Sequence, residues 1–236
     1  MYSDGHNDAF AESREQASIQ ASFVAKVYGW MCFALGITGL VSFLVVTNPQ
    51  MVKVVFGNQM VFIGLLIAEF LIVIGLSSLI NKISAYTATA VFIAYSALNG
   101  ITFGVIFLVY TASSIASTFF ITAGTFGTMA LYGYITKRDL TKLGNLFFMA
   151  LIGLIIATVV NMFWANSMLY WITTYAGVVI FCGLTAYDTQ KIKEMAVGLE
   201  GNFESERKGA IIGALSLYLD FINLFLFLLR IFGSRR

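Results

Sequence analysis

The chain has 236 residues, of which 59% are hydrophobic and 11% are charged, against about 25% charged residues in an ordinary soluble domain. One core of this length cannot hide that much apolar surface, which excludes a simple soluble globule and indicates that lipid is part of the solvent. The formal net charge of +2 gives no support for nucleic acid as a partner.

The first 22 residues are polar and carry more acidic than basic side chains. A secretory signal needs a basic start and an early apolar stretch, and this leader has neither. We therefore predict a mobile cytoplasmic tail over residues 1–22 and a transmembrane domain over residues 23–236.

Seven apolar stretches follow, each long enough, at roughly 20 residues, to cross a hydrocarbon core of about 30 Å. The alternating pattern of a membrane β-barrel does not occur, so the sequence predicts an all-α integral membrane protein, a seven-helix transmembrane bundle. The predicted spans are Val27–Thr47, Met60–Ile80, Ala85–Val109, Ser113–Tyr134, Asn145–Ala165, Met168–Tyr187 and Gly209–Phe232.

The basic residues indicate how the bundle is oriented. With seven alternating spans, ten of the 14 Lys and Arg residues fall on the side of the N-terminal tail. The positive-inside rule then predicts a cytoplasmic N-terminus and an external C-terminus. The final pair Arg235-Arg236 is the exception, and a last segment that only dips into the membrane would leave six spans. We favour seven.

Small residues at four-residue spacing recur in three of the spans. They are Gly100 with Gly104, Ala123 with Gly127, and Gly209 with Gly213. Such pairs allow helix backbones to approach closely in a membrane, and we expect each of them to mark a packed helix interface.

Four charged residues lie in or at the ends of the apolar segments: Glu69, Asp188, Asp220 and Arg230. A charge at the centre of a membrane helix costs about 3 kcal/mol on insertion scales, and such residues usually face a cavity, a partner or an ion path. We expect the function to reside among these four.

Asp188 directly follows the predicted sixth span, whereas Asp220 lies about eleven residues into the seventh, at a depth of roughly 16 Å. For the two carboxylates to meet, the sixth helix must continue further or the seventh must begin higher. If they meet, two carboxylates in a dry bundle cannot both remain ionised cheaply, and they would share a proton that exchanges near physiological pH.

When both carboxylates are ionised, the pair offers hard oxygen ligands that suit Ca²⁺. One device would then serve as a pH gate and as a metal site, with Ca²⁺ as the bound or transported ion and no cofactor. The alternative is that Asp188 caps a helix end and Asp220 bonds a neighbouring hydroxyl. For Glu69 and Arg230, which have opposite charges, we predict a structural ion pair.

The sequence gives little support for an enzyme. The single histidine, His6, excludes a His-based hydrolase, and the two cysteines have no metal-ligand spacing. An intramembrane aspartyl protease also places Tyr-Asp on one helix and a second Asp on the next. Its second motif has glycines where this chain has bulky Leu217, Tyr218 and Leu219, and the Pro-Ala-Leu motif it requires is missing. We therefore expect no catalytic residues.

The run Leu217-Tyr218-Leu219-Asp220-Phe221-Ile222-Asn223-Leu224-Phe225, continuing to Leu228-Leu229-Arg230, together with Tyr187-Asp188 resembles one family. It is the transmembrane Bax inhibitor motif family, also called Bax inhibitor-1-like, and in particular its bacterial inner-membrane members. The resemblance implies a central last helix ringed by the other six. It also implies a pH-sensitive calcium leak gated by the aspartates that match Asp188 and Asp220, with Glu69 and Arg230 as matching partners.

One feature departs from the family pattern. In some members a basic residue near the cytoplasmic end of the second helix latches the aspartate pair, and the matching position here falls at about Ile80. The candidates for this latch are therefore the neighbours Asn81 and Lys82. The lysine-rich tail of eukaryotic members is also missing, so we carry over no role in apoptosis.

A different reading stays open. The chain could be a membrane-embedded partner or modulator of a protease or of a stress-response system, without transport activity. The lipid bilayer, Ca²⁺, protons and other membrane proteins are thus the partners that the sequence suggests.

Overall fold

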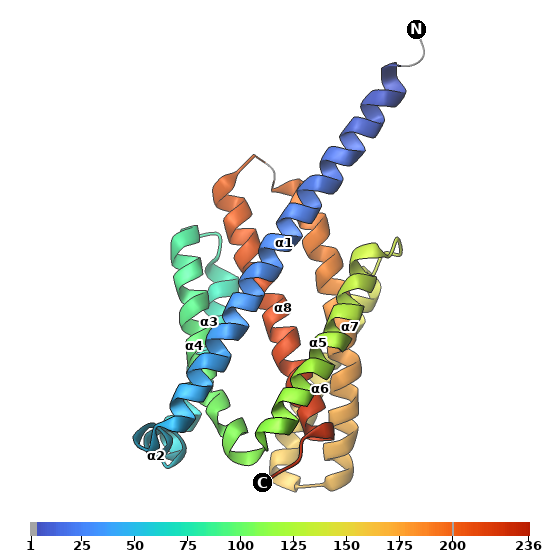
Figure 1. Cartoon of the computed structure of the whole chain (residues 1–236). Coiled ribbons are helices and arrows are strands. Elements are labelled where there is room, and N and C mark those ends of the chain that lie inside the picture. Colours follow the sequence, from blue (N-terminus) through green and yellow to red (C-terminus); the bar gives the residue numbers. More distant parts are fainter. Residues whose placement is uncertain (1–3, 200) are drawn as a thin grey trace.

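The computed structural model describes residues 4–199 and 201–236, and within them the regular elements are all helices (Figure 1). The elements are α1 (Asp4–Thr47), α2 (Pro49–Phe56), α3 (Gln59–Leu79), α4 (Ala85–Val109), α5 (Ala112–Ile135), α6 (Thr141–Trp164), α7 (Ser167–Gly198) and α8 (Phe203–Phe232).

Seven of these helices are long and apolar enough to cross a membrane, which confirms the prediction of seven spans. The remaining helix, α2, is short and lies between the first two spans, and the sequence did not predict it. Residues 1–3 of the predicted tail lie outside the described residues. From Asp4 onward the tail is helical and continuous with the first span, and its mobility stays a prediction.

Polar side chains define where most of the helices begin. In each of these caps a side-chain oxygen accepts a hydrogen bond from a backbone N–H that lacks a partner in the first turn. The residues that do this are Asn48, Asn58, Ser84, Thr111, Asn166 and Asn202. Short polar turns therefore interrupt a sequence that is otherwise apolar and fix the boundaries of the spans.

The last helix, α8, lies at the centre of the bundle, as the sequence predicted. Leu217, Tyr218 and Leu224 are completely buried, and α8 packs against α1, α4, α5 and α7. The remaining two spans occupy outer positions, because α3 packs on α4 and α6 packs on α7. Both outer helices expose most of their apolar side chains, as expected for surfaces that face lipid.

The ring around α8 is open in two places. In the described part of the chain, α3 and α6 form no extended contact, and neither do α1 and α5, whose Tyr28 and Phe126 rings meet edge to face with centroids 6.4 Å apart. Each of these gaps leads inward to α8. At the end of the bundle where α7 and α8 are joined, α1 crosses over to pack on α7, so the gap between α1 and α5 is closed at that end.

Small residues bring α4 and α8 close to their neighbours, as predicted for two of the three pairs. A side chain at Gly100 would collide with the backbone and side chains of α1, and one at Gly104 would press on Val45 and Phe56. Gly213 faces Ile192 of α7 in the same way. The prediction was wrong for Ala123 with Gly127, since Gly127 has only open space beside it.

The predicted end of the sixth span, which corresponds to α7, is wrong by eleven residues. The sequence indicated an end at Tyr187, where hydropathy falls, but the helix continues to Gly198. Its polar residues beyond Tyr187 bind neighbouring helices. The Gln190 side-chain oxygen accepts a hydrogen bond from the Leu140 N–H at 2.8 Å, and Thr189 shares a 3.0 Å hydrogen bond with Tyr28. The helix therefore ends eleven residues after the apolar stretch does.

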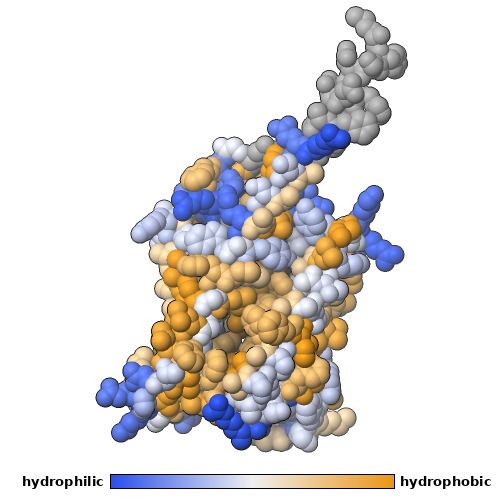
Figure 2. Space-filling view, viewed as in Figure 1, coloured by the Kyte–Doolittle hydropathy of each residue, from blue (hydrophilic) through white to orange (hydrophobic). Residues whose placement is uncertain are grey.

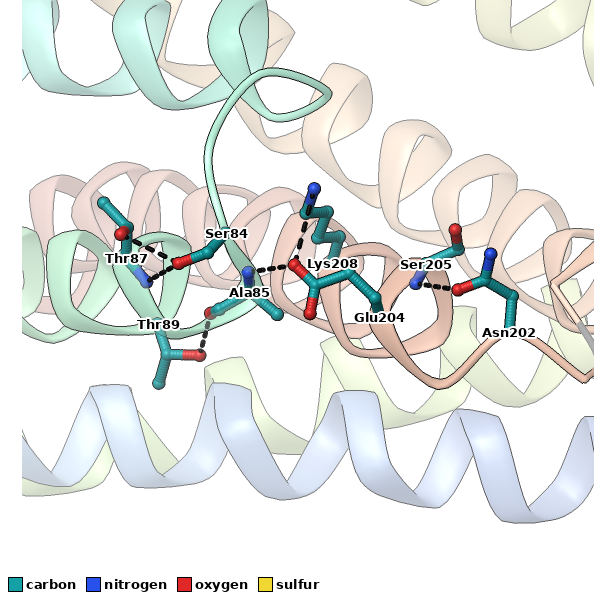
Figure 3. A network of polar contacts seen from close by, with 8 residues as sticks. All are labelled: Ser84, Ala85, Thr87, Thr89, Asn202, Glu204, Ser205 and Lys208. Atoms are coloured by element: carbon teal, nitrogen blue, oxygen red, sulfur yellow. Dashed lines mark hydrogen bonds and ion pairs between the residues drawn. The ribbon is translucent and has the colours of Figure 1, made fainter.

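The first turns of α8 are fixed to the start of α4 and to the middle of α1. The Glu204 carboxylate accepts a hydrogen bond of 2.6 Å from the Ala85 N–H, the first of α4, and its own helix supplies Lys208 at 3.5 Å (Figure 3). Two residues further on, Glu206 forms an ion pair with Lys26 of α1. These contacts tie α1, α4 and α8 together at the end of the bundle that carries the α7–α8 turn.

Candidate functional site

The gap between α3 and α6 leads to a cavity of about 810 Å³ beside α8. Side chains from α3, α4, α6, α7 and α8 line it. All four charged residues that the sequence singled out belong to this lining: Glu69, Asp188, Asp220 and Arg230. Charged groups that are far apart in the sequence therefore share one space inside the membrane-spanning part of the bundle.

One face of α8 forms the inner wall of the cavity. Its lining residues recur at intervals of three or four, which places them on one side of a helix. From Ser216 to Arg230 this face is about 21 Å long at 1.5 Å per residue, against a hydrocarbon core of about 30 Å. The cavity therefore covers much of the membrane thickness. The lining residues on α8 are Ser216, Leu219, Asp220, Asn223, Phe227 and Arg230.

Asp220 is the most deeply placed of the charged groups. Its residue is 5% exposed, and its Oδ2 atom has no hydrogen-bond partner among the described residues. A buried carboxylate oxygen without a partner is rare, because desolvation then goes uncompensated. Such a group fits a site that a proton, a water molecule or a cation completes.

Asp188 lines the same cavity from the neighbouring helix α7. Asp188 is only partly exposed. In the predicted helices Asp188 lay near the membrane surface and Asp220 lay deep. The two residues can lie at similar depths because α7 extends past Asp188 by ten residues to Gly198. The longer sixth span is what allows the two acidic residues to reach one cavity.

A basic residue that the sequence reasoning missed accompanies this pair. Lys191 lines the cavity and lies over the ring of Tyr187, at 5.9 Å from its centroid. Lys191 follows Asp188 by three residues, so the two share a helix face. That spacing was a usable signal, but it had meaning only once the helix was known to continue through both residues.

The candidates for the latch, Asn81 and Lys82, are not near the aspartates. Both lie in the turn after α3, both are exposed, and neither lines the cavity. The Lys82 N–H bonds back to the Leu79 carbonyl at 2.8 Å, which closes the turn on itself. In this structure the cation that lines the cavity with the pair comes from α7, and a latch at Asn81 or Lys82 stays a prediction.

The structural ion pair predicted for Glu69 and Arg230 is not formed in the described part of the chain. The Glu69 carboxylate instead accepts a 2.8 Å hydrogen bond from the Thr102 hydroxyl. The Arg230 guanidinium lies over the rings of Tyr170 and Phe227, at 5.6 Å and 5.1 Å from their centroids. Each group has a local partner on a neighbouring turn or helix, and both still face the cavity.

A smaller polar cluster continues from Glu69 into α4. The Asn99 amide donates a 2.8 Å hydrogen bond to the Tyr95 hydroxyl, and Tyr95 lines the cavity. The Oδ1 atom of Asn99 is buried and has no partner among the described residues. On α8, Asn223 donates to the Leu219 carbonyl of its own helix at 2.8 Å. Polar groups thus follow the cavity along its length.

The donor set suits a passing ion better than a resident one. Within the described residues, no three His, Cys, Asp or Glu side chains gather as a metal-binding group. Ca²⁺ takes six to eight oxygen ligands, so two carboxylates would leave most of its coordination shell to water and to neutral oxygens. The geometry therefore suits weak and reversible contact with a hydrated cation.

A bundle of seven membrane-length helices whose buried last helix carries charge defines a multi-pass helical membrane protein. The chain belongs to the Bax inhibitor-1-like family, whose model, described as "Inhibitor of apoptosis-promoting Bax1", matches residues 20–236.

Bacterial relatives cover almost the whole chain. "Inner membrane protein YbhL" of Escherichia coli is 52% identical over 91% of this chain and 92% of its own length. An uncharacterized protein of Borreliella burgdorferi is 45% identical over 95% of this chain and 97% of its own length. An uncharacterized protein of Rickettsia prowazekii is 43% identical, over 91% and 90%. The name of the first relative and the seven apolar helices support a multi-pass bacterial inner-membrane protein.

Proposed function

We propose that this protein is a pH-sensitive cation leak channel that passes Ca²⁺ along the cavity beside α8, with Asp188 and Asp220 as the gate. The observation that carries the proposal is Asp220, a buried carboxylate with an unpartnered oxygen in a space that a second carboxylate shares. A purely structural role would give such a group a hydrogen-bond partner.

The chemistry of the pair links protons to cations. Two ionised carboxylates at close range in a medium of low dielectric repel each other, and either a shared proton or a cation relieves that repulsion. A proton and Ca²⁺ therefore compete for the same oxygens. As pH falls, protonation removes the charge that attracts Ca²⁺, so occupancy by the metal must change with pH.

The balance of charge in the lining also bears on which ions the cavity favours. Lys191 lies beside Asp188, and Arg230 lies about 15 Å from Asp220 along α8. With the two aspartates and Glu69 ionised, the acidic groups of the lining outnumber the basic ones, and such a cavity favours cations. Protonation of one aspartate removes that excess.

The orientation forms part of the proposal. Ten of the 14 basic residues fall at the end that carries the α7–α8 turn and the N-terminal helix. The positive-inside rule assigns that end to the cytoplasm. The aspartate pair would then lie nearer the cytoplasmic side and Arg230 nearer the external side.

The direct test is Ca²⁺ entry into proteoliposomes, measured with a trapped indicator between pH 5 and pH 8. We expect flux that depends on pH in the wild type and becomes low or independent of pH in Asp220→Asn. Asp139→Asn is the matched control, because it removes an exposed carboxylate outside the cavity and keeps an oxygen that can cap α6.

Two results would overturn the proposal. One is the absence of flux in a wild-type protein that is folded and inserted. The other is flux that depends neither on pH nor on Asp220. Either result would leave the non-transporting partner as the better account of the cavity.

A further inference from the structure

The second gap in the ring, between α1 and α5, contains a groove of about 320 Å³ that is distinct from the charged cavity. Figure 2 shows the surface hollowed between these helices, within a band of hydrophobic side chains. The groove runs in to α8, where Phe221, Ile222 and Phe225 form its floor. It therefore opens toward the space that lipid chains occupy in a membrane.

The lining of the groove offers a ligand almost no free polar atom. Its two hydroxyl groups on α1 are bonded inside the protein: Thr38 donates to carbonyl oxygens or pairs with Tyr218, and Ser42 donates to the Gly100 carbonyl at 2.8 Å. The other walls are aromatic and aliphatic, with the Phe119 ring against those of Phe221 and Phe225. A water molecule in the groove would gain almost no hydrogen bond, whereas a hydrocarbon chain would gain apolar contacts.

One end of the groove carries positive charge. Ile106 and Ala112, which line the groove, flank the α4–α5 turn, and the C-terminal segment is attached to that turn by backbone hydrogen bonds. Arg236 donates from its N–H to the Val109 carbonyl at 3.0 Å, and the Thr111 N–H donates to Ser234 at 3.0 Å. Two exposed arginines therefore lie beside the groove, at the membrane face that carries the C-terminus.

These arginines have no acidic neighbour in that turn, because residues 106–118 contain no Asp or Glu. The hydrogen bond that Arg235 makes to the Tyr110 hydroxyl raises the pKa of its guanidinium, so this group stays cationic. Basic side chains at a membrane surface attract anionic lipid head groups. An apolar groove that ends beside two arginines matches an anionic phospholipid in both of its parts.

We propose that the groove between α1 and α5 binds one anionic phospholipid, with an acyl chain along Phe119, Ile222 and Phe225 and its phosphate at Arg235 and Arg236. The site does not depend on the proposed ion route, because it lies on another face of α8 and shares no lining residue with the charged cavity.

The experiment uses the full chain in vesicles that contain photoreactive phosphatidylglycerol with a diazirine on one acyl chain. After illumination, mass spectrometry maps the labelled residues. We expect labels on the groove walls of α1, α5 and α8. Loss of one arginine charge in Arg236→Gln should reduce labelling about fivefold, since each basic residue near the surface contributes about 1 kcal/mol. Lys53→Gln removes the same charge elsewhere and should change nothing.

A second pair of variants tests the acyl chain. Gly39 lines the groove, and a Cβ atom there meets nothing within 4 Å, so Gly39→Leu should fill the groove without a clash. Gly36→Leu is the matched control: it lies nearly one turn away on α1, in equally open space and outside the lining. Ala116→Leu blocks the groove from α5 and serves if the first variant folds poorly.

Labelling that persists in both Gly39→Leu and Ala116→Leu would overturn the site. Equal labelling by a phosphatidylethanolamine probe of the same chain would overturn the assignment of an anionic head group. Neither result bears on Ca²⁺ flux, so this proposal and the proposed function fail separately.

Discussion

Replacing Asp220 with leucine should stabilise the protein while it removes the proposed gate. Asp220 places a carboxylate in the middle of α8, where one oxygen has no hydrogen-bond partner among the described residues. An unsatisfied buried polar group costs about 1–3 kcal/mol, and its replacement by an apolar group of similar shape can be neutral or stabilising. Leucine has the same number and branching of side-chain heavy atoms as aspartate, and its slightly larger methyl groups have room because Asp220 borders the cavity.

The expected gain is therefore about 1–3 kcal/mol, which corresponds to a rise of about 2–12 °C in the unfolding temperature for a chain of this size. Thermal unfolding in detergent, followed by the fluorescence of a thiol-reactive dye or by size-exclusion chromatography after heating, measures it. Ser216→Leu is the control, because it adds apolar surface to the same wall of the cavity without removing a charge.

The sign of the change in unfolding temperature distinguishes a structural role of Asp220 from a functional one. If Asp220→Leu lowers the unfolding temperature by several degrees, and Ser216→Leu does not, the carboxylate has stabilising partners in the folded protein. Asp220 would then be a structural residue, and the central argument for a gate would be lost. A gain in stability together with a loss of flux would instead indicate that the acid is kept for function.

Three further predictions concern the packing and the polar ends of the helices. Gly133→Leu should destabilise the fold by roughly 1–3 kcal/mol, because its Cβ would meet a backbone carbonyl of α7, whereas Gly64→Leu, in open space, should not; thermal unfolding compares the two. Glu204→Ala removes the carboxylate that accepts from the first N–H of α4 and should cost about 1 kcal/mol in the same assay. Hydrogen bonds from Thr141 lower the pKa of the Asp139 carboxyl, so Asp139 stabilises the start of α6 above the ordinary carboxyl pKa of about 3.9. In a pH series of thermal unfolding, the difference in stability between the wild type and Asp139→Ala should vanish as pH falls through the lowered value.

The number of spans and the central place of α8 could be predicted from the sequence, for different reasons. The length of a continuous apolar stretch can be counted in the sequence, which is why α4 ends at Val109 as predicted. The central helix came from the resemblance that its motif carries. Hydropathy alone did not distinguish α8 from α3, since a helix buried in protein and a helix buried in lipid are both apolar.

The residues beside the aspartates were harder to find because they depend on where helices end and on what lies opposite. Hydropathy falls at Tyr187, yet α7 continues because Gln190 bonds the α5–α6 turn, a contact that the sequence does not reveal. Charge complementarity suggested that Glu69 and Arg230 would pair, but Thr102 is a nearer partner for the carboxylate. Complementary charge indicates which groups could meet, while packing decides which of them do.

The two openings in the ring differ in polarity because the two faces of α8 differ. Ser216, Asp220 and Asn223 face the gap between α3 and α6, whereas Phe221, Ile222 and Phe225 face the gap between α1 and α5. Asp220 and Phe221 are adjacent in the sequence, and a rotation of about 100° per residue is enough to turn them toward different gaps. A helix at the centre of a ring can therefore present an ionic wall to one gap and a hydrocarbon wall to the other. Exchanging this pair of residues would place the charge in the apolar groove, and it should abolish both proposed sites at once.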